Sequence, residues 1–259
     1  CSMYVIDLNS DLGESFGAWK MGDDESVLQF VSSANIACGF HAGDPVVMLT
    51  TVKAAKEKVV AVGAHPGYPD LMGFGRRNID VTPDEVYAYT LYQIGAMQAV
   101  CNAVGIKLQH VKAHGALYNQ AVKNNALAVA IAQAVKDAGE GLILLGLANS
   151  EFDKAAAEVG VPYAAEAFAD RAYQADGTLV PRKVPGSMIH DVELAVARVV
   201  RMVKEGKVET IDGHIIDLKP HSICLHGDSP KAVQMATEIR KGLEAAGIKI
   251  RPMSEVIKL

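Results

Sequence analysis

Short apolar runs alternate along the chain with segments of helical periodicity. The runs lie at 4–9, 33–38, 59–64, 108–113, 142–146, 163–168, 222–225 and 249–253. Two of the helical segments, 125–139 and 191–206, each close on a glycine. Strands that alternate with helices build βαβ units, and their strands pair in parallel. The pattern therefore predicts an α/β fold with seven or eight parallel strands in a single domain over residues 1–259.

Local signals mark where several of these elements begin. Asp44-Pro45 and Ser229-Pro230 each place a capping residue before a proline at the first helical position, and Thr82 is followed at the third position by the capping-box residue Glu85. The segment 208–218 breaks the rhythm, because Asp212-Gly213 lies between alternating apolar residues. This pattern is typical of a two-residue turn, so we expect a small β-hairpin outside the main sheet.

Parallel strands with intervening helices form either an open sheet or a closed barrel. No GxGxxG follows the first strand, and no GxxxxGK[ST] occurs anywhere. Their absence weakens the nucleotide-binding versions of the open sheet. A chain of 259 residues, half of them apolar, has the usual size of a (β/α) barrel. We therefore expect an irregular, seven-stranded (β/α) barrel.

Charge and composition narrow the class of protein. The formal net charge is −5, and Lys and Arg are scattered, so we expect no nucleic-acid partner. No apolar run approaches the ~20 residues of a membrane span, and we find no secretory signal. The four cysteines form no CxxC pair, which fits a reducing compartment. These features together predict a cytoplasmic protein without a membrane partner.

Polar residues follow almost every predicted strand at the point where it ends. In chain order they are Asn9, Asp11, Glu14, His41, Asp44, His65, Lys112, His114, Tyr118, Glu166, Asp170, Arg171, His226 and Asp228. The carboxyl ends of parallel barrel strands share one face, where barrel enzymes place their active sites. A His and Asp cluster there could bind a divalent cation or perform general acid–base chemistry.

The remaining histidines and the cysteines receive a structural interpretation. His110, His190, His214 and His221 fall inside or before predicted elements rather than at strand ends. Cys38 and Cys224 end apolar strands, where a free cysteine usually packs as a small hydrophobe. Asp44 and Asp228 could cap helices as well as face the site.

Eight motifs together resemble the LamB/YcsF family. They are DLNSDLGESFG, ANIACGFHAGDP, VGAHPGYPD, GFGRR, VKAHGALYN, EAFADRAY, LVPR and CLHGDSP, and they occur in the family's order over about residues 4–253. The resemblance implies a barrel of the glycoside hydrolase/deacetylase type. It also implies cleavage of 5-oxo-L-proline to L-glutamate, coupled to hydrolysis of ATP to ADP and phosphate, in a 5-oxoprolinase with partner subunits B and C.

A wider similarity to metal-dependent deacetylases implies a metal set of Asp11, His65 and His114, with His41 as a competing ligand. For lactam opening, Asp11 or His41 would be the general base and His114 or His226 the general acid. Lys112 and Arg171 would offset negative charge, oriented by Glu166 and Asp170, while Asp44 and Asp228 complete the catalytic candidates. Candidate substrate-binding residues are Asn9, Glu14, His65, Tyr118, Asp170 and Arg182.

The sequence leaves three interpretations of the function open, of which lactam opening is the first. Without a P-loop, ATP would bind mainly to the partner subunits, and this chain would open the activated lactam. A metal-dependent deacetylase is a second interpretation. A non-catalytic subunit that binds a small metabolite is a third.

Overall fold

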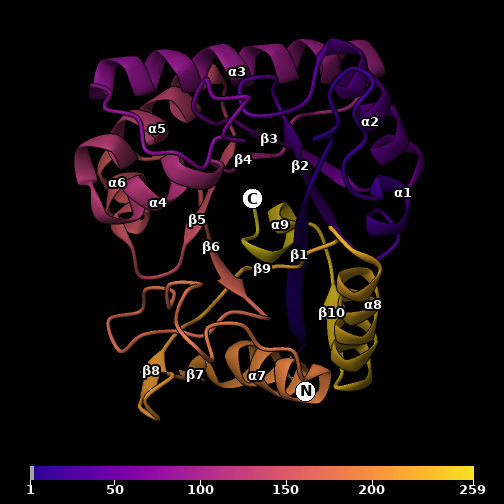
Figure 1. Ribbon diagram of the computed structural model, residues 1–259, viewed down its shortest axis with the longest axis vertical. Coiled ribbons are helices and arrows are strands. Elements are labelled where there is room, and N and C mark those ends of the chain that lie inside the picture. Colours follow the sequence, from indigo (N-terminus) through magenta and orange to yellow (C-terminus); the bar gives the residue numbers. More distant parts are fainter. Residues whose placement is uncertain (1–2) are drawn as a thin grey trace.

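The computed structural model describes residues 3–259 and contains a closed barrel of seven parallel strands (Figure 1). The barrel strands are β1 (Tyr4–Leu12), β2 (Ser33–Ala37), β3 (Ala61–His65), β4 (His110–Val111), β5 (Ile143–Leu147), β6 (Tyr163–Phe168) and β9 (Ser222–Cys224). Neighbours pair in this order, and β9 closes the ring by pairing with β1. The predicted seven-stranded (β/α) barrel is therefore confirmed.

Strand β1 divides its length among three partners. Tyr4–Ile6 pairs with β10 (Ile248–Ile250), Asp7–Asn9 with β9, and Asn9–Leu12 with β2. The eighth apolar run therefore forms a strand that extends the sheet below the closed ring. The predicted hairpin is also present, as β7 (Lys207–Glu209) and β8 (Ile215–Asp217), which pair only with each other.

Helices cover the outside of the barrel, except for the last, which lies across its amino-end face. They are α1 (Asp24–Val27), α2 (Pro45–Glu57), α3 (Pro83–Val104), α4 (Gly115–Lys123), α5 (Asn125–Ala138), α6 (Glu151–Val159), α7 (Val192–Glu205), α8 (Pro230–Ala245) and α9 (Met253–Val256). The predicted caps are formed, because Asp44, Thr82 and Ser229 accept hydrogen bonds from Val47 N, Glu85 N and Ala232 N. Each cap fixes where a helix leaves the carboxyl-end face.

Hydrogen-bonded polar side chains fill much of the barrel interior. Asp7 accepts hydrogen bonds from the hydroxyls of Ser32, Ser33 and Ser222. Burial raises the pKa of Asp7 to about 6, against the lowering effect of these hydroxyls. Above it, Asn9 donates to Ser222 and accepts from Asn35. Buried polar groups need such partners, so this network runs toward the functional face.

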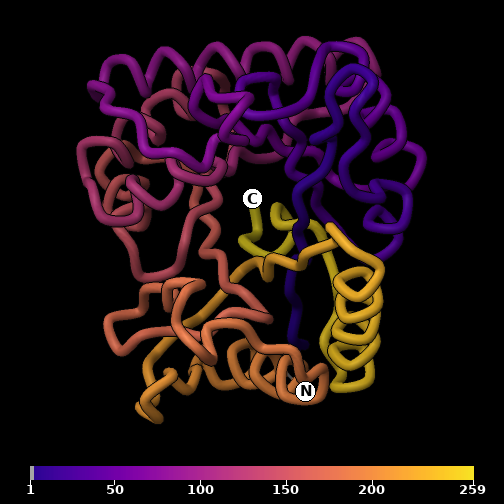
Figure 2. Tube along the Cα trace, in the orientation of Figure 1, coloured from indigo at the N-terminus to yellow at the C-terminus, as the bar shows by residue number. Residues whose placement is uncertain are grey.

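The last residues close the opposite, amino-end face of the barrel. Met253 is buried against Ile143, Leu145 and Ala164, and Arg251 N donates to Ile6 O. In Figure 2 the tube ends near the middle of the view, within the surrounding elements. Ligands can therefore approach the interior from the carboxyl-end face.

Two further expectations concern the cysteines and membranes. Cys38, Cys101 and Cys224 are free and buried, whereas Cys1 lies outside the described residues. Among residues 3–259, no helix has both the length and the apolar character needed to cross a bilayer.

Candidate active site

A cavity of about 690 Å³ opens at the carboxyl ends of the barrel strands. Residues of β1, β3, β5, β6 and β9 line it, together with the loops that follow β3, β4, β6 and β9 and with α4. Its walls include most of the residues that sequence reasoning selected: Asp11, His65, Lys112, His114, Tyr118, Arg171, Arg182 and His226. Strand ends far apart in the sequence thus converge on one cavity.

His65 and His114 face each other at one end of the cavity, with His65 Nε2 and His114 Nδ1 3.1 Å apart. The other nitrogens contact backbone carbonyls, His65 Nδ1 at 2.7 Å from Lys112 O and His114 Nε2 at 2.7 Å from Phe74 O. A carbonyl only accepts, so these outer nitrogens carry the protons. Burial lowers the pKa of His114 to about 3. Neutral His114 therefore directs the lone pair of its Nδ1 toward His65 Nε2, an arrangement that suits a shared cation.

Asp11 and Glu14 extend this donor set. Asp11 Oδ1 lies 3.4 Å from His65 Nε2, and Glu14 Oε2 lies 4.0 Å from His114 Nδ1. Suitable atoms of Glu14, His41, His65 and His114 all fall within 4.8 Å of one another. Imidazole nitrogens and carboxylate oxygens are the usual ligands of divalent transition metals. The residues present therefore fit a divalent cation.

Lys112 stands at the floor of the cavity between two carboxylates. Its Nζ lies 2.9 Å from Glu166 Oε2 and 3.5 Å from Asp11 Oδ1. Burial opposes its charge, but Asp11, Cys224 and Glu166 hold the pKa of Lys112 well above its usual value. Burial also raises the pKa of Asp11, yet the charges of His65 and Lys112 outweigh it and keep that pKa well below its usual range. Lys112 and Asp11 are both ionised.

His41 lies behind the cavity rather than in its wall. Its ring stacks on that of His114 at 3.5 Å between centroids, and its Nε2 lies 3.0 Å from Glu14 Oε2. Burial, together with His114 and His65, keeps the pKa of His41 well below its usual value. Burial and the charge of Asp11 raise the pKa of Glu14 well above its usual value. His41 and Glu14 therefore support the histidine pair.

His226 lines the cavity and pairs with Asp170, His226 Nδ1 lying 2.8 Å from Asp170 Oδ2. Burial lowers the pKa of His226, but the hydrogen bond to Asp170 and the charge of Asp170 outweigh this effect, so the pKa of His226 is raised. Burial raises the pKa of Asp170, and His226 more than offsets it, leaving the pKa below its usual value. His226 is thus better able to hold a proton than His41 or His114.

Two other selected residues, Tyr118 and Asn9, have mainly internal contacts. Tyr118 donates to Glu166 Oε1 at 2.8 Å, and burial and Glu166 raise the pKa of Tyr118 well above its usual value. Asn9 is buried beneath the cavity, in contact with Asn35, Ser222 and Lys112. These residues hold Lys112 and Glu166 in place.

The structure does not bring Asp44 or Asp228 into the cavity wall. Asp44 accepts hydrogen bonds from Val47 N at 2.8 Å and Gly17 N at 2.7 Å, so both oxygens serve the backbone. Asp228 is exposed at the start of α8, where Ser229 is the capping residue. A Gly-Asp pair just before a helix, as at 43–44 and 227–228, therefore does not by itself place an aspartate in the site.

Asn35 and Cys224 contribute to the site, although sequence reasoning did not select them. Asn35 donates to Asp11 Oδ1 at 3.0 Å and lies 2.6 Å from His110 Nε2. His110 in turn accepts from Gln109 Nε2 at its Nδ1. Cys224 lines the cavity 3.6 Å from Lys112 Nζ, where burial, despite Lys112, raises the pKa of its thiol well above the usual value. The inward alternation of strands β2 and β9 could have indicated both residues.

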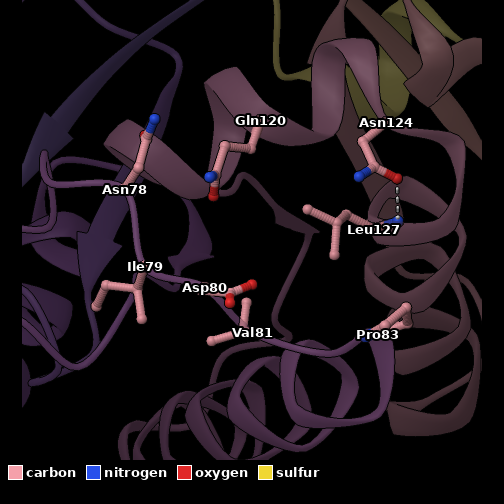
Figure 3. Close-up of a pocket in the computed structure, with 8 residues that line it drawn as sticks. All are labelled: Asn78, Ile79, Asp80, Val81, Pro83, Gln120, Asn124 and Leu127. Atoms are coloured by element: carbon pink, nitrogen blue, oxygen red, sulfur yellow. Dashed lines mark hydrogen bonds between the residues drawn. The ribbon is translucent and has the colours of Figure 1, made fainter.

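A second cavity of about 400 Å³ adjoins the first and shares Asn78 and Gln120 with it. Figure 3 shows its walls, formed by the segment before α3, by α4 and by the start of α5, where Asn124 accepts from Leu127 N. Its lining contains one titratable side chain, Asp80. The cluster of titratable groups belongs to the larger cavity.

Geometry and topology together define a class: a (β/α) barrel whose carboxyl-end cavity joins a histidine–carboxylate cluster to a buried lysine. The LamB/YcsF family model matches residues 6–258, and the chain belongs to this family. A relative from Alkaliphilus metalliredigens, named as the A subunit of 5-oxoprolinase, is 55% identical over 256 residues, covering 99% of this chain and 100% of that protein.

Solved structures support the same assignment of fold. The lactam utilization protein from Thermus thermophilus has a TM-score of 0.91 and 48% identity, covering 95% of this chain and 99% of that chain. A peptidoglycan N-acetylglucosamine deacetylase has a TM-score of 0.50 at 10% identity, covering 98% of this chain and 88% of that chain. The latter likeness concerns the fold alone.

Proposed function

We propose that the chain is the lactam-opening subunit of an ATP-dependent 5-oxoprolinase, which converts 5-oxo-L-proline to L-glutamate. The observation that carries the proposal is the convergence of Asp11, His65, Lys112 and His226 on one cavity. Family membership and the names of the full-length relatives support the choice of substrate.

The substrate explains why ATP is required. The lactam amide is stabilised by resonance, and its nitrogen is a poor leaving group. Transfer of the γ-phosphoryl group of ATP to the amide oxygen releases ADP and leaves an electrophilic carbon. Water then adds to this carbon, the C–N bond breaks, and the nitrogen takes a proton. A second water hydrolyses the resulting acyl phosphate to glutamate and inorganic phosphate.

The protonation states of the site suit these steps. Asp11 is ionised and lies in the cavity wall, where it can accept a proton from the attacking water, whereas His41 lies behind the cavity. Lys112 stabilises negative charge on the phosphorylated oxygen. His226 holds a proton through Asp170 and donates it to the departing nitrogen, whereas His114 is neutral at ordinary pH.

A divalent metal held by His65, His114 and Asp11 would polarise a carbonyl or activate water when bound. The two outer hydrogen bonds to Lys112 O and Phe74 O already orient both imidazoles for this task. Glu14 and His41 would steady the second side of the cluster.

ATP and the partner subunits belong to the same proposal. The chain has no P-loop motif, so we assign phosphoryl transfer mainly to subunits B and C. The names of the relatives, which describe one subunit of a larger enzyme, support such an assembly. We further propose that the assembly acts in the cytoplasm.

Reconstitution with the two partner subunits tests the proposal. Glutamate release should require 5-oxoproline, ATP and all three chains, and Asp11→Asn should lower kcat by roughly 10²–10⁴-fold, as expected for loss of a general base. The isolated chain should not couple 5-oxoproline to ATP hydrolysis. Full activity of Asp11→Asn, or robust ATP turnover by the chain alone, would contradict this division of roles.

Metal-dependent deacetylation is the second candidate, and the facing ring nitrogens of His65 and His114 favour it. It predicts metal-dependent release of acetate from an N-acetyl sugar by the isolated chain. Acetate release without any glutamate formation in the reconstituted assembly would favour this activity over lactam opening.

A further inference from the structure

One wall of the cavity carries a guanidinium with a buried nitrogen that has no partner among residues 3–259. Arg171 is only 8% exposed and lines the cavity. Its Nη2 donates to Val180 O at 2.9 Å, while its buried Nε has no hydrogen-bond partner. A buried donor without an acceptor is costly, and a buried charge without a partner costs more. The side chain is therefore poised to receive an acceptor from the cavity.

A second guanidinium, Arg182, lines the same wall. Among residues 3–259, no Asp or Glu forms an ion pair with either arginine. Burial and the charge of Arg182 lower the pKa of Arg171, and the charge of Asp170 offsets them only in part. Two adjacent cations without a carboxylate partner form a receptor for an oxyanion, which guanidinium groups bind in a planar, bidentate manner.

The segment that carries both arginines is held in place by its own hydrogen bonds. Arg198 donates from Nη1 to Ala169 O and from Nη2 to Arg171 O. Ala172 N donates to Ser187 O, and Val180 N donates to Ala172 O. The backbone that carries both arginines is thus ordered before a ligand arrives, which reduces the entropy lost on binding.

The charge of the cavity differs from that of the whole chain. Its lining contains five Lys and Arg side chains and one carboxylate, although the chain carries a formal net charge of −5. A cleft lined with one sign of charge raises the local concentration of oppositely charged ligands. The excess of positive charge indicates that the ligand is an anion.

We propose that Arg171 and Arg182 form an oxyanion subsite that takes the carboxylate of the small lactam substrate. This inference rests on the proposed function. Binding of the carboxylate at this wall leaves the lactam amide to face Lys112 and the His65–His114 pair. The subsite thereby separates recognition of the substrate from the chemistry at its ring.

Binding to the full chain, measured by calorimetry, tests the subsite directly. The probes are 5-oxoproline, 2-pyrrolidinone, which is the same ring without the carboxylate, and inorganic phosphate. Wild-type chain should bind 5-oxoproline about 10- to 100-fold more tightly than 2-pyrrolidinone, as expected for charge-assisted hydrogen bonds. Arg182→Met should remove most of this preference and leave 2-pyrrolidinone binding unchanged.

Two further variants guard against loss of fold. Lys183→Met removes a charge from the same exposed segment outside the cavity wall, and it should bind like wild type. Arg171→Lys keeps the charge but not the planar donor geometry, so it should weaken 5-oxoproline binding while circular dichroism remains unchanged. In the reconstituted assembly, both Arg variants should raise the KM for 5-oxoproline more than they lower kcat.

Several results would overturn the subsite. One is equal affinity of the wild-type chain for 5-oxoproline and 2-pyrrolidinone, and another is unchanged affinity of Arg182→Met for 5-oxoproline. A third is the absence of 5-oxoproline binding to the chain and to the assembly. The last is an Arg182→Met variant that loses affinity for inorganic phosphate but not for 5-oxoproline. If the assembly forms no glutamate but the Arg variants still lose 5-oxoproline binding, the proposed function is rejected and the subsite is kept. Glutamate formation with unaltered KM in both variants would reject only the subsite.

Discussion

Two segments of the chain contain Cys, His, Gly, Asp and Pro in the same order, with other residues between them. The histidines of these two copies have different roles. In residues 38–45, His41 is enclosed behind His114 and contacts Glu14, and its pKa is lowered. In residues 224–230, His226 lines the cavity and contacts Asp170, and its pKa is raised. The two pKa shifts differ because the histidines have different neighbours, and these neighbours are brought together only by the fold. A repeated local phrase therefore predicts a strand end and a helix start, but not the chemistry of its histidine.

The largest expected difference between the two copies is catalytic. His226→Asn should lower kcat of the reconstituted assembly by roughly 10²–10⁴-fold, because it removes the proposed proton donor. His41→Asn should act mainly on stability, because the lost ring packs on His114. Glutamate release and thermal unfolding measure the two effects, and His214→Asn, at an exposed hairpin position, serves as control. Near-normal turnover by His226→Asn would remove it from the mechanism.

Replacing the glycine of either copy by alanine should destabilise the protein, but for a different physical reason in each copy. Gly43 has φ of +78°, and a Cβ there would lie 2.9 Å from the backbone oxygen of Gly13. A Cβ on Gly227 would instead lie 2.2 Å from the side chain of Val27. Both Gly→Ala variants should lose about 1–3 kcal/mol of unfolding free energy, from left-handed strain in one and overpacking in the other.

A double-mutant cycle in urea separates these causes. Val27→Ala should partly rescue Gly227→Ala, so that the pair costs less than the sum of the single variants. No comparable truncation should rescue Gly43→Ala, because backbone blocks the space. Additive costs for Gly227→Ala and Val27→Ala would show that the close approach is relieved in another way.

The caps should give smaller effects. Asp44→Ala and Ser229→Ala should each cost about 0.5–2 kcal/mol, because each removes an acceptor at a helix N-terminus. Asp228→Ala should change stability little, because Asp228 is exposed beside the cap. Urea unfolding measures all three variants. A large loss of kcat in Asp44→Ala, without loss of stability, would return Asp44 to the catalytic candidates.

The smallest effect is a change in titration. Asp170→Asn should lower the pKa of His226, read from its imidazole proton by NMR. Because the folded pKa of His226 is raised, its share of stability is present below the unfolded pKa and is lost as pH rises through the folded value. The folded pKa of Asp170 is depressed, so its share is present above its unfolded pKa and is lost on acidification. The variant should therefore be most destabilised at the intermediate pH where both groups are charged. An unchanged His226 titration would mean that Asp170 does not set it.

Local signals were sufficient to predict most of the architecture. The caps at Asp44, Thr82 and Ser229, the turn at Asp212-Gly213 and the alternation of strands with helices each depend on residues a few positions apart. The expected convergence of strand ends followed from parallel topology alone. The family resemblance, now confirmed over residues 6–258, agreed with this interpretation.

Contacts between distant segments decided what could not be predicted. Asp170 and His226 are 56 positions apart, and Asn35 meets Asp11 and His110 only through strand register. Whether Asn9 lies beneath the cavity or in its wall depends on a rise of two residues along β1. The missing partner of Arg171 Nε is a property of the packed loop, which no pattern in the sequence expresses.

Pairing of β1 with β9 also has a consequence for the order in which the chain folds. Asp7 aligns with Ser222 and Asn9 with Cys224, so the ring joins strands whose paired residues lie 215 positions apart. Until residue 224 leaves the ribosome, one edge of β1 has no native neighbour, and such nascent edges attract other chains. Contacts this distant in sequence slow the search for the native state. We expect the growing polypeptide to depend on molecular chaperones during translation.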